Sequence, residues 1–139
     1  MSFREKSAWV MAVVTIAAGL YYLNLVVAGS RGLAEAPAPV GIFISYTILL
    51  VVASVAAQVL LALLSPKEAS APADERERPL LHAAGHWSGI LLGFGAVASL
   101  LSFLAYRDGN LLFHMLLGSL IVSQVAEYAL QIALFRRSA

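Results

Sequence analysis

Glu127 stands out chemically because it is a carboxylate inside a long apolar stretch of the sequence. Helix geometry puts it about 12 Å from the inner end of that stretch. A charge at that depth of a bilayer costs a few kcal/mol, so the side chain must face protein or water. At about 100° per residue, one half of the predicted helix carries the polar side chains Ser119, Ser123, Gln124, Glu127, Tyr128 and Gln131. We expect the other half to face lipid with Leu117, Ile121, Val125, Ala129 and Ile132.

Polar residues at a similar depth in the other apolar stretches predict a cluster around this carboxylate. Its expected members are Glu127, Gln124, Gln131, Gln58, Thr15 and Ser88. As a functional site, the cluster would let Glu127 exchange a proton or pair with a cation. As a structural element, a protonated Glu127 would donate a hydrogen bond to a glutamine or carbonyl of a neighbouring helix. Both interpretations stay open at this point.

A second polar set lies towards the outer side of the predicted membrane: Asn24, Ser45, Tyr46, Thr47, Ser102 and His114. Asn24 and His114 are the candidates for ligand contact. Haem held between two histidines would need His114 from two copies of the chain, so we predict no haem and no other cofactor. His82 and His86 share a helix face but lack a third ligand, and we predict no metal site.

The composition excludes an ordinary soluble domain. The chain has 139 residues, of which 60% are hydrophobic and 12% are charged, and its formal net charge is +1. Soluble domains are typically about 45–50% apolar and about 25% charged. The absence of cysteine excludes disulfides and thiolate sites, and the near-neutral charge argues against nucleic acid as a partner. Phosphate-binding loops and hydrolase motifs are also absent, so we do not expect an enzyme.

Four apolar stretches are long enough to cross a bilayer, which takes about 20 residues in a helix. They cover about 8–28, 40–64, 87–106 and 111–135. We therefore predict an all-α polytopic membrane protein with one domain over 1–139, built as two antiparallel hairpins. A glycine- and proline-rich loop joins the first two spans, a charged loop over about 65–86 joins the second and third, and a tight turn at 107–110 joins the last two.

The distribution of basic residues predicts the orientation. Two of them, Arg31 and Arg107, lie on one side, whereas the termini and the middle loop carry Arg4, Lys6, Lys67, Arg76, Arg78, Arg136 and Arg137. By the positive-inside rule, both termini are cytoplasmic in a cell (inner) membrane. A secretory signal peptide is the alternative for the first stretch, but an apolar run over 8–28 exceeds the usual length of about 7–15 residues.

Glycines recur every fourth residue in the third span, at Gly85, Gly89 and Gly93. They fall on nearly one helix face, where the missing side chains let another helix approach closely. That helix belongs either to the same chain or to a second copy, and the sequence leaves the two alternatives open.

The middle loop carries a run of mixed charges, Asp74, Glu75, Arg76, Glu77 and Arg78. Such a run is typical of a solvated segment, and it could also dock a cytoplasmic partner. With the following helix and the final Arg136-Arg137, this run resembles a family of uncharacterised small bacterial and archaeal four-span membrane proteins with a D-E-R-x-R loop. The resemblance covers the second half of the chain and implies a four-span topology without a known activity.

Two functions are compatible with these features. The first is a non-catalytic membrane module in contact with lipid, either a homodimer or an accessory subunit of another membrane protein. The second is a minimal proton-coupled transporter of a small molecule, acting as a dimer with Glu127 as the coupling carboxylate. The fixed orientation predicted from the charges argues against an antiparallel dimer of the transporter type.

Overall fold

The computed structural model is all-helical over the residues it describes, which are 2–32, 35–71 and 74–138. Its elements are α1 (Phe3–Gly29), α2 (Pro39–Leu64), the short α3 (Pro66–Ala69), α4 (Glu77–Tyr106) and α5 (Gly109–Ser138). All but α3 are long and apolar enough to cross a membrane, which confirms the predicted all-α class with four candidate spans. The parts of the predicted segments at 1, 33–34, 72–73 and 139 lie outside the described residues.

Helix α4 begins ten residues before the expected start of the third span, at Glu77 instead of Trp87. The expected loop over 65–86 is therefore shorter, and α3 adds a turn to it. Pro79 does not interrupt the helix because it stands in the first turn, where the backbone N–H has no intrahelical acceptor. The charged residues before it favour this start, since Glu77 in the first turn complements the helix dipole.

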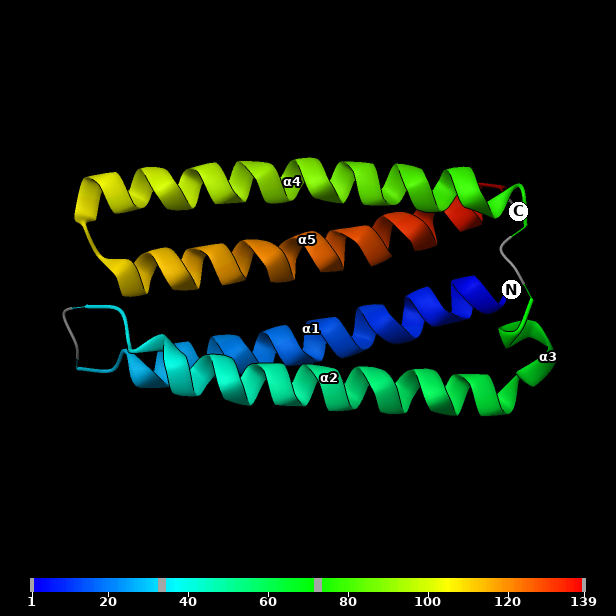
Figure 1. The fold of residues 1–139 in the computed structure, drawn as a ribbon, viewed down its shortest axis with the longest axis horizontal. Helices are drawn as coiled ribbons and strands as arrows, with labels where there is room; N and C mark the ends of the chain where they lie inside the picture. The colour runs from blue at the N-terminus through cyan, green and yellow to red at the C-terminus, as the bar shows by residue number, and fades with distance from the viewer. Residues whose placement is uncertain (1, 33–34, 72–73, 139) are drawn as a thin grey trace.

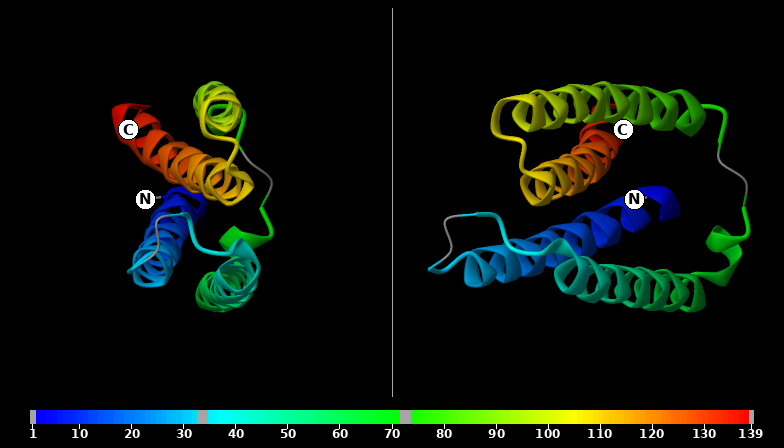
Figure 2. Two further views of the ribbon diagram at one scale, coloured as in Figure 1. Left: turned by 90° about the vertical axis from the view of Figure 1, so that its left-hand side faces the viewer. Right: turned by 60° about the vertical axis from the view of Figure 1, so that its left-hand side comes forward.

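The four long helices lie side by side in the order α2, α1, α5, α4 (Figure 1). Helix α5 packs against both α4 and α1, and α1 also packs against α2, whereas α2 touches α5 only lightly. Figure 2 shows α5 and α1 crossing at an angle when the row is seen from its end. The ends of the row are taken along the helix axes. Both termini and α3 lie at one of these ends, and the α1–α2 and α4–α5 connections lie at the other (Figure 1).

Helix α1 offers a line of mostly small buried residues to its neighbours: Ala8, Ala12, Thr15, Ala18 and Tyr22. They are spaced three or four residues apart and so share one face. Gly19 lies beside this line, and a Cβ added there would come within 2.9 Å of Ile121 Cγ2. Close backbone approach is the main source of helix association in lipid, where burial of apolar surface gives no driving force.

The apolar half of α5 is covered by protein, which makes the expected lipid-facing half wrong in part. Leu117, Ile121 and Ile132 are buried in the two core clusters formed with α1. The physical reason is the central place of α5, which has a neighbour on each side. The most exposed large apolar side chains instead lie on the edge helices, where Leu64 of α2 and Phe94 of α4 are 81% and 73% exposed.

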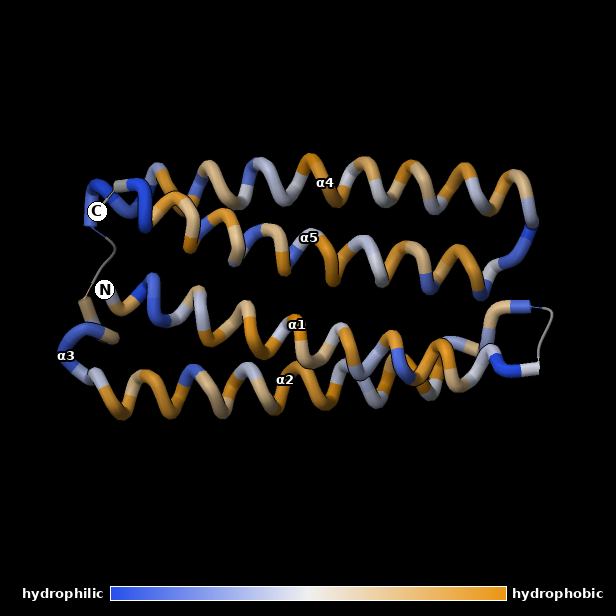
Figure 3. The backbone as a smooth tube through the Cα atoms, turned by 180° about the vertical axis from the view of Figure 1, so that it is seen from behind, coloured by the Kyte–Doolittle hydropathy of each residue, from blue (hydrophilic) through white to orange (hydrophobic). Residues whose placement is uncertain are grey.

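Hydrophilic residues concentrate at the two ends of the row and hydrophobic residues along its length (Figure 3). At the end that holds the termini, Arg4 Nε lies 3.6 Å from Glu77 Oε2, and Lys6 Nζ lies 3.1 Å from Glu68 Oε2. The Arg136 guanidinium lies 5.4 Å from the centre of the Trp9 ring, a cation–π distance. These contacts join α1 to the starts of α3 and α4 and to the end of α5.

Candidate functional site

Glu127 lies half-buried between α5 and α4. Gln131, one turn further along α5, donates from Nε2 to Glu127 Oε1 at 3.2 Å. The Ser88 hydroxyl of α4 lies 3.5 Å from Glu127 Oε2 and also donates to the Gly85 carbonyl at 3.0 Å. Ser123 donates to the Ser88 carbonyl at 2.8 Å, which fixes the two helices at this level. The partners of the carboxylate in the described chain are thus neutral, and none of its lysines or arginines forms an ion pair with it.

The predicted six-residue cluster is only partly assembled. Gln58 of α2 pairs instead with Ser7 of α1, donating from Nε2 to the serine hydroxyl at 2.9 Å. Gln124 is exposed on α5, and Thr15 is fully buried on α1, where its Oγ1 has no hydrogen-bond partner within the described ranges. The separation follows from the helix order, because α1 lies between α2 and α5.

Tyr128, expected on the polar half of α5, packs with its ring against the core cluster of Ala8, Ala12 and Ile132. It is half-buried between α5 and α1, on a different side of α5 from the contact of Glu127 with Ser88. Side chains of the predicted polar half of α5 therefore contact two different helices, α4 and α1.

His114 forms a buried hydrogen-bonded group towards the end of the row opposite the termini. Its Nε2 lies 2.9 Å from the Pro37 carbonyl, which can only accept, so Nε2 carries the proton. Its Nδ1 lies 2.6 Å from the Tyr22 hydroxyl and accepts from it in the neutral ring. Both ring nitrogens are therefore engaged, an arrangement that does not fit ligation of haem iron. The other outer candidate, Asn24, is exposed on α1 and apart from this group.

Tyr22 and Pro37 are partners that the sequence did not single out. The Tyr22 ring also contacts the Tyr46 ring edge to face, with centroids 5.5 Å apart. No local sequence pattern predicts this group, because its members are far apart in sequence and come from α1, α2, α5 and the α1–α2 connection. The residue types indicated only that partners are needed, because polar aromatic residues within predicted spans require hydrogen-bond partners for their polar atoms.

The glycines of α4 fall into two groups with different surroundings. Among the described residues, a Cβ added at Gly85, Gly89 or Gly93 would meet no atom of another helix within 4 Å. In contrast, a Cβ at Gly95 would clash with the Ser119 side chain of α5. Of the two alternatives, packing of this stripe inside the chain is therefore not supported, and Gly95 is the glycine at the α4–α5 contact. Gly89 and Gly93 remain exposed on the outer helix.

The charge run at 74–78 forms the start of helix α4 and the residues just before it, and is not a free loop. Glu77 Oε2 accepts from the Asp74 N–H at 3.3 Å, and the Asp74 carbonyl accepts from the Glu77 N–H at 3.0 Å. Glu77 also pairs with Arg4. The side chains of this run that stay exposed are those of Asp74, Glu75, Arg76 and Arg78.

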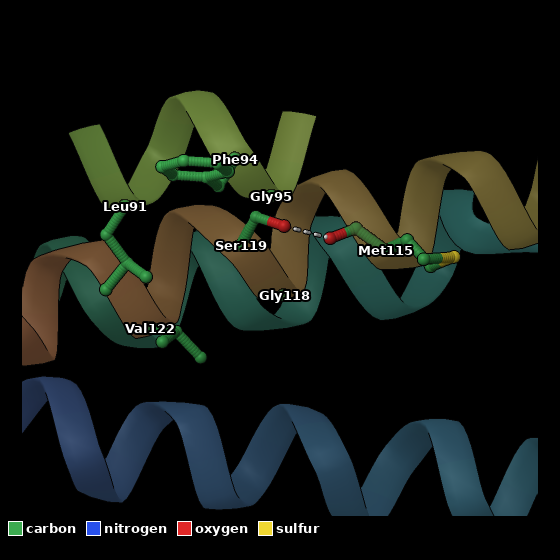
Figure 4. Close-up of a pocket in the computed structure, with 7 residues that line it drawn as sticks. All are labelled: Leu91, Phe94, Gly95, Met115, Gly118, Ser119 and Val122. Atoms are coloured by element: carbon green, nitrogen blue, oxygen red, sulfur yellow. Dashed lines mark hydrogen bonds between the residues drawn. The ribbon is translucent and has the colours of Figure 1, made fainter. Parts of the chain in front are cut away.

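Two hollows flank the helices. One, of about 320 Å³, is an apolar groove between α4 and α5 in which Gly95 and Gly118 form the floor. Figure 4 shows the Ser119 hydroxyl inside it donating to the Met115 carbonyl, a bond of 2.8 Å, so no polar group there is left for a ligand. The other, of about 740 Å³, lies between the α1–α2 connection and the α4–α5 turn and is lined by polar and charged residues. Within the described ranges, no three metal-ligating side chains come together.

The fold thus defines a helical protein with four helices suited to crossing a membrane, a class supported by length and apolarity. Comparison with protein-family models, with curated proteins and with solved structures found no match to this chain.

Proposed function

We propose that this chain is a non-catalytic integral membrane module that self-associates or serves as an accessory subunit of another membrane protein. The observation that carries the proposal is the face of α4 at Gly85, Gly89 and Gly93, where an added Cβ would meet no atom of another helix within 4 Å in the described chain. Glycine in a span loses more backbone entropy on ordering than alanine, so three of them on one face, two of them exposed, need a reason. Close packing of a second transmembrane helix supplies it.

In the proposed topology, the chain lies in the inner (cell) membrane as two antiparallel hairpins. Both termini are then in the cytoplasm. This topology is supported by the ends of the row, since Figure 1 places both termini and α3 at the same end. That end carries the larger number of basic residues, and the opposite end carries Arg31 and Arg107. Cytoplasmic loops and ends are enriched in Lys and Arg. The resemblance to four-span proteins with a D-E-R-x-R loop remains a prediction consistent with this topology.

The test of self-association is the oligomeric state of a double variant, Gly89→Leu with Gly93→Leu, in mild detergent and in lipid nanodiscs. Native mass spectrometry of the wild type should give a dimer or a stoichiometric complex with a larger membrane protein. The variant should be a monomer, because two leucines would hold the facing helix away. Gly41→Leu on α2 is the matched control, since a Cβ added at Gly41 also meets no atom within 4 Å in the described chain. A wild-type monomer without any co-purifying subunit would refute the proposal.

A second candidate, the proton-coupled transporter, is favoured by the surroundings of Glu127. The carboxylate is kept within a span beside neutral hydrogen-bonding groups, an arrangement compatible with gain and loss of a proton. Transport in sealed vesicles driven by a pH gradient should then be lost in Glu127→Gln and kept in Glu75→Gln, which changes an exposed carboxylate at the start of α4. Equal transport activity of the two variants would refute the transporter proposal.

A further inference from the structure

The hollow of about 740 Å³ lies at the end of the row opposite the termini. One wall comes from the α1–α2 connection and the other from the end of α4, the turn and the start of α5. Its lining residues are Ser30, Glu35, Ala36, Tyr106, Arg107 and Asp108, with Gly109, Asn110 and Leu111.

Hydrogen bonds from α5 hold the two walls in a fixed relation. His114 Nε2 donates to the Pro37 carbonyl at 2.9 Å, and Asn110 Nδ2 donates to the Ala36 carbonyl at 3.3 Å. The first of these bonds is buried and is backed by the bond between Tyr22 and His114. On the other wall, Asp108 Oδ1 accepts from the backbone N–H groups of Asn110 and Leu111, which fixes the turn at the start of α5. These bonds fix Ala36 and Pro37 of the connection against the start of α5.

Charges of both signs line this hollow, with Arg107 on one side of the balance and Glu35 and Asp108 on the other. Neither Arg107 nor Glu35 forms an ion pair in the described part of the chain. Asp108 uses one carboxylate oxygen for the turn and has the second oxygen left. A ligand that carries both a cationic and an anionic group would complement these residues together.

The backbone at Arg107 gives an independent reason to look for a ligand here. Arg107 has φ +56° and ψ +24°, the left-handed conformation in which helices commonly end on glycine. It is the one non-glycine residue in the described chain with a positive φ. An arginine at this position is strained compared with glycine, and such strain concentrates at functional sites. The conformation therefore marks Arg107 as a candidate functional residue.

We propose that this hollow binds a small zwitterion, with the Arg107 guanidinium on its anionic group and the Glu35 carboxylate on its ammonium group. Tyr106 and Leu111 supply apolar wall for the part that joins the two groups. The ligand chemistry has two sources, a free phosphoethanolamine-type compound in water or the headgroup of phosphatidylethanolamine at the membrane surface. The proposal is independent of self-association, since α4 presents its glycine face along its length and the hollow at its end.

The test uses the full-length protein in detergent with two probes. Calorimetric titration with glycerophosphoethanolamine measures the free zwitterion, and native mass spectrometry with dioleoyl phosphatidylethanolamine or phosphatidylglycerol measures the lipid. Binding of the soluble probe identifies a free ligand, and retention of the ethanolamine lipid without binding of the soluble probe identifies the headgroup. Both results support the proposal, provided that phosphatidylglycerol, which lacks the ammonium group, binds at least about tenfold more weakly.

Variants decide whether the named residues carry the binding. Arg107→Gln and Glu35→Gln should each weaken it at least about tenfold, as expected for loss of a charge-assisted hydrogen bond. Arg31→Gln is the matched control, because Arg31 is exposed near the same connection and does not line the hollow. Arg107→Gly relieves the backbone, so it should keep or raise the thermal midpoint while losing binding. Equal binding of both lipids, or equal effects of Arg107→Gln and Arg31→Gln, would overturn the proposal.

Discussion

Replacing Gly95 with alanine is expected to lower the free energy of unfolding by about 1–3 kcal/mol, the usual range for overpacking. An added Cβ at this position would clash with Ser119 on the facing helix. The clash includes the Ser119 Cβ, which is attached to the backbone and cannot rotate away, so α4 and α5 must separate. The contact lies at the middle of the most extensive helix pair in the fold.

Gly93→Ala provides the matched control two residues away on the same helix. Its Cβ would meet nothing within 4 Å of its own chain, so the gain in helix propensity, roughly 0.5–1 kcal/mol, should appear in the monomer. The two variants should therefore differ by about 1.5–4 kcal/mol. Ser119→Gly in the Gly95→Ala background should restore part of the loss, because it removes the atoms that clash.

The assay is unfolding in mixed micelles by titration with a denaturing detergent, followed by circular dichroism, on protein held monomeric. Equal stabilities of Gly95→Ala and Gly93→Ala would refute the reasoning, because the close approach of α4 and α5 would then not depend on Gly95. Failure of Ser119→Gly to rescue would locate the clash elsewhere.

Two further predictions concern buried polar groups in the spans. Tyr22→Phe removes the donor to His114 Nδ1 and should destabilise the protein by about 1 kcal/mol, whereas Tyr21→Phe, an exposed neighbour, should change the same unfolding curve little. Equal effects would show that the Tyr22 hydroxyl contributes nothing specific. Thr15→Val replaces a fully buried hydroxyl that has no partner within the described ranges, and it should be neutral or raise the thermal midpoint by a few degrees. A clear loss of stability would mean that this hydroxyl has a bound partner in the membrane.

Part of the candidate site could be predicted because helix periodicity is local. Glu127 and Gln131 are one turn apart on any α-helix, so their contact follows from sequence spacing alone. Ser88 was expected at a similar depth in the third span, and the structure places its hydroxyl 3.5 Å from Glu127 Oε2. Gln58 was expected in the same cluster for its depth, but depth does not specify which helix lies beside it.

The sequence missed what depends on pairs from distant segments. His114 was singled out as a ligand candidate, yet its partners Tyr22 and Pro37 lie in α1 and in the next connection. The stripe at Gly85, Gly89 and Gly93 looked equally suited to a neighbour in the chain, whereas Gly95 makes the close contact. Spacing identifies a face that permits approach, and it carries no information about which helix approaches.

The sequence by itself determined the solvent and the spans, because a run of about 20 apolar residues satisfies its backbone as a helix in lipid regardless of its neighbours. The bounds predicted for α2 were correct to within one residue, whereas the predicted start of α4 was ten residues too late. The reason is that charged residues in the first turns of a helix have the composition of a loop. Only the tertiary structure decided the order α2, α1, α5, α4 and with it the burial of Leu117, Ile121 and Ile132. In lipid, helix order is set by the fit of small-residue faces and by a few polar contacts, and these are properties of two surfaces together.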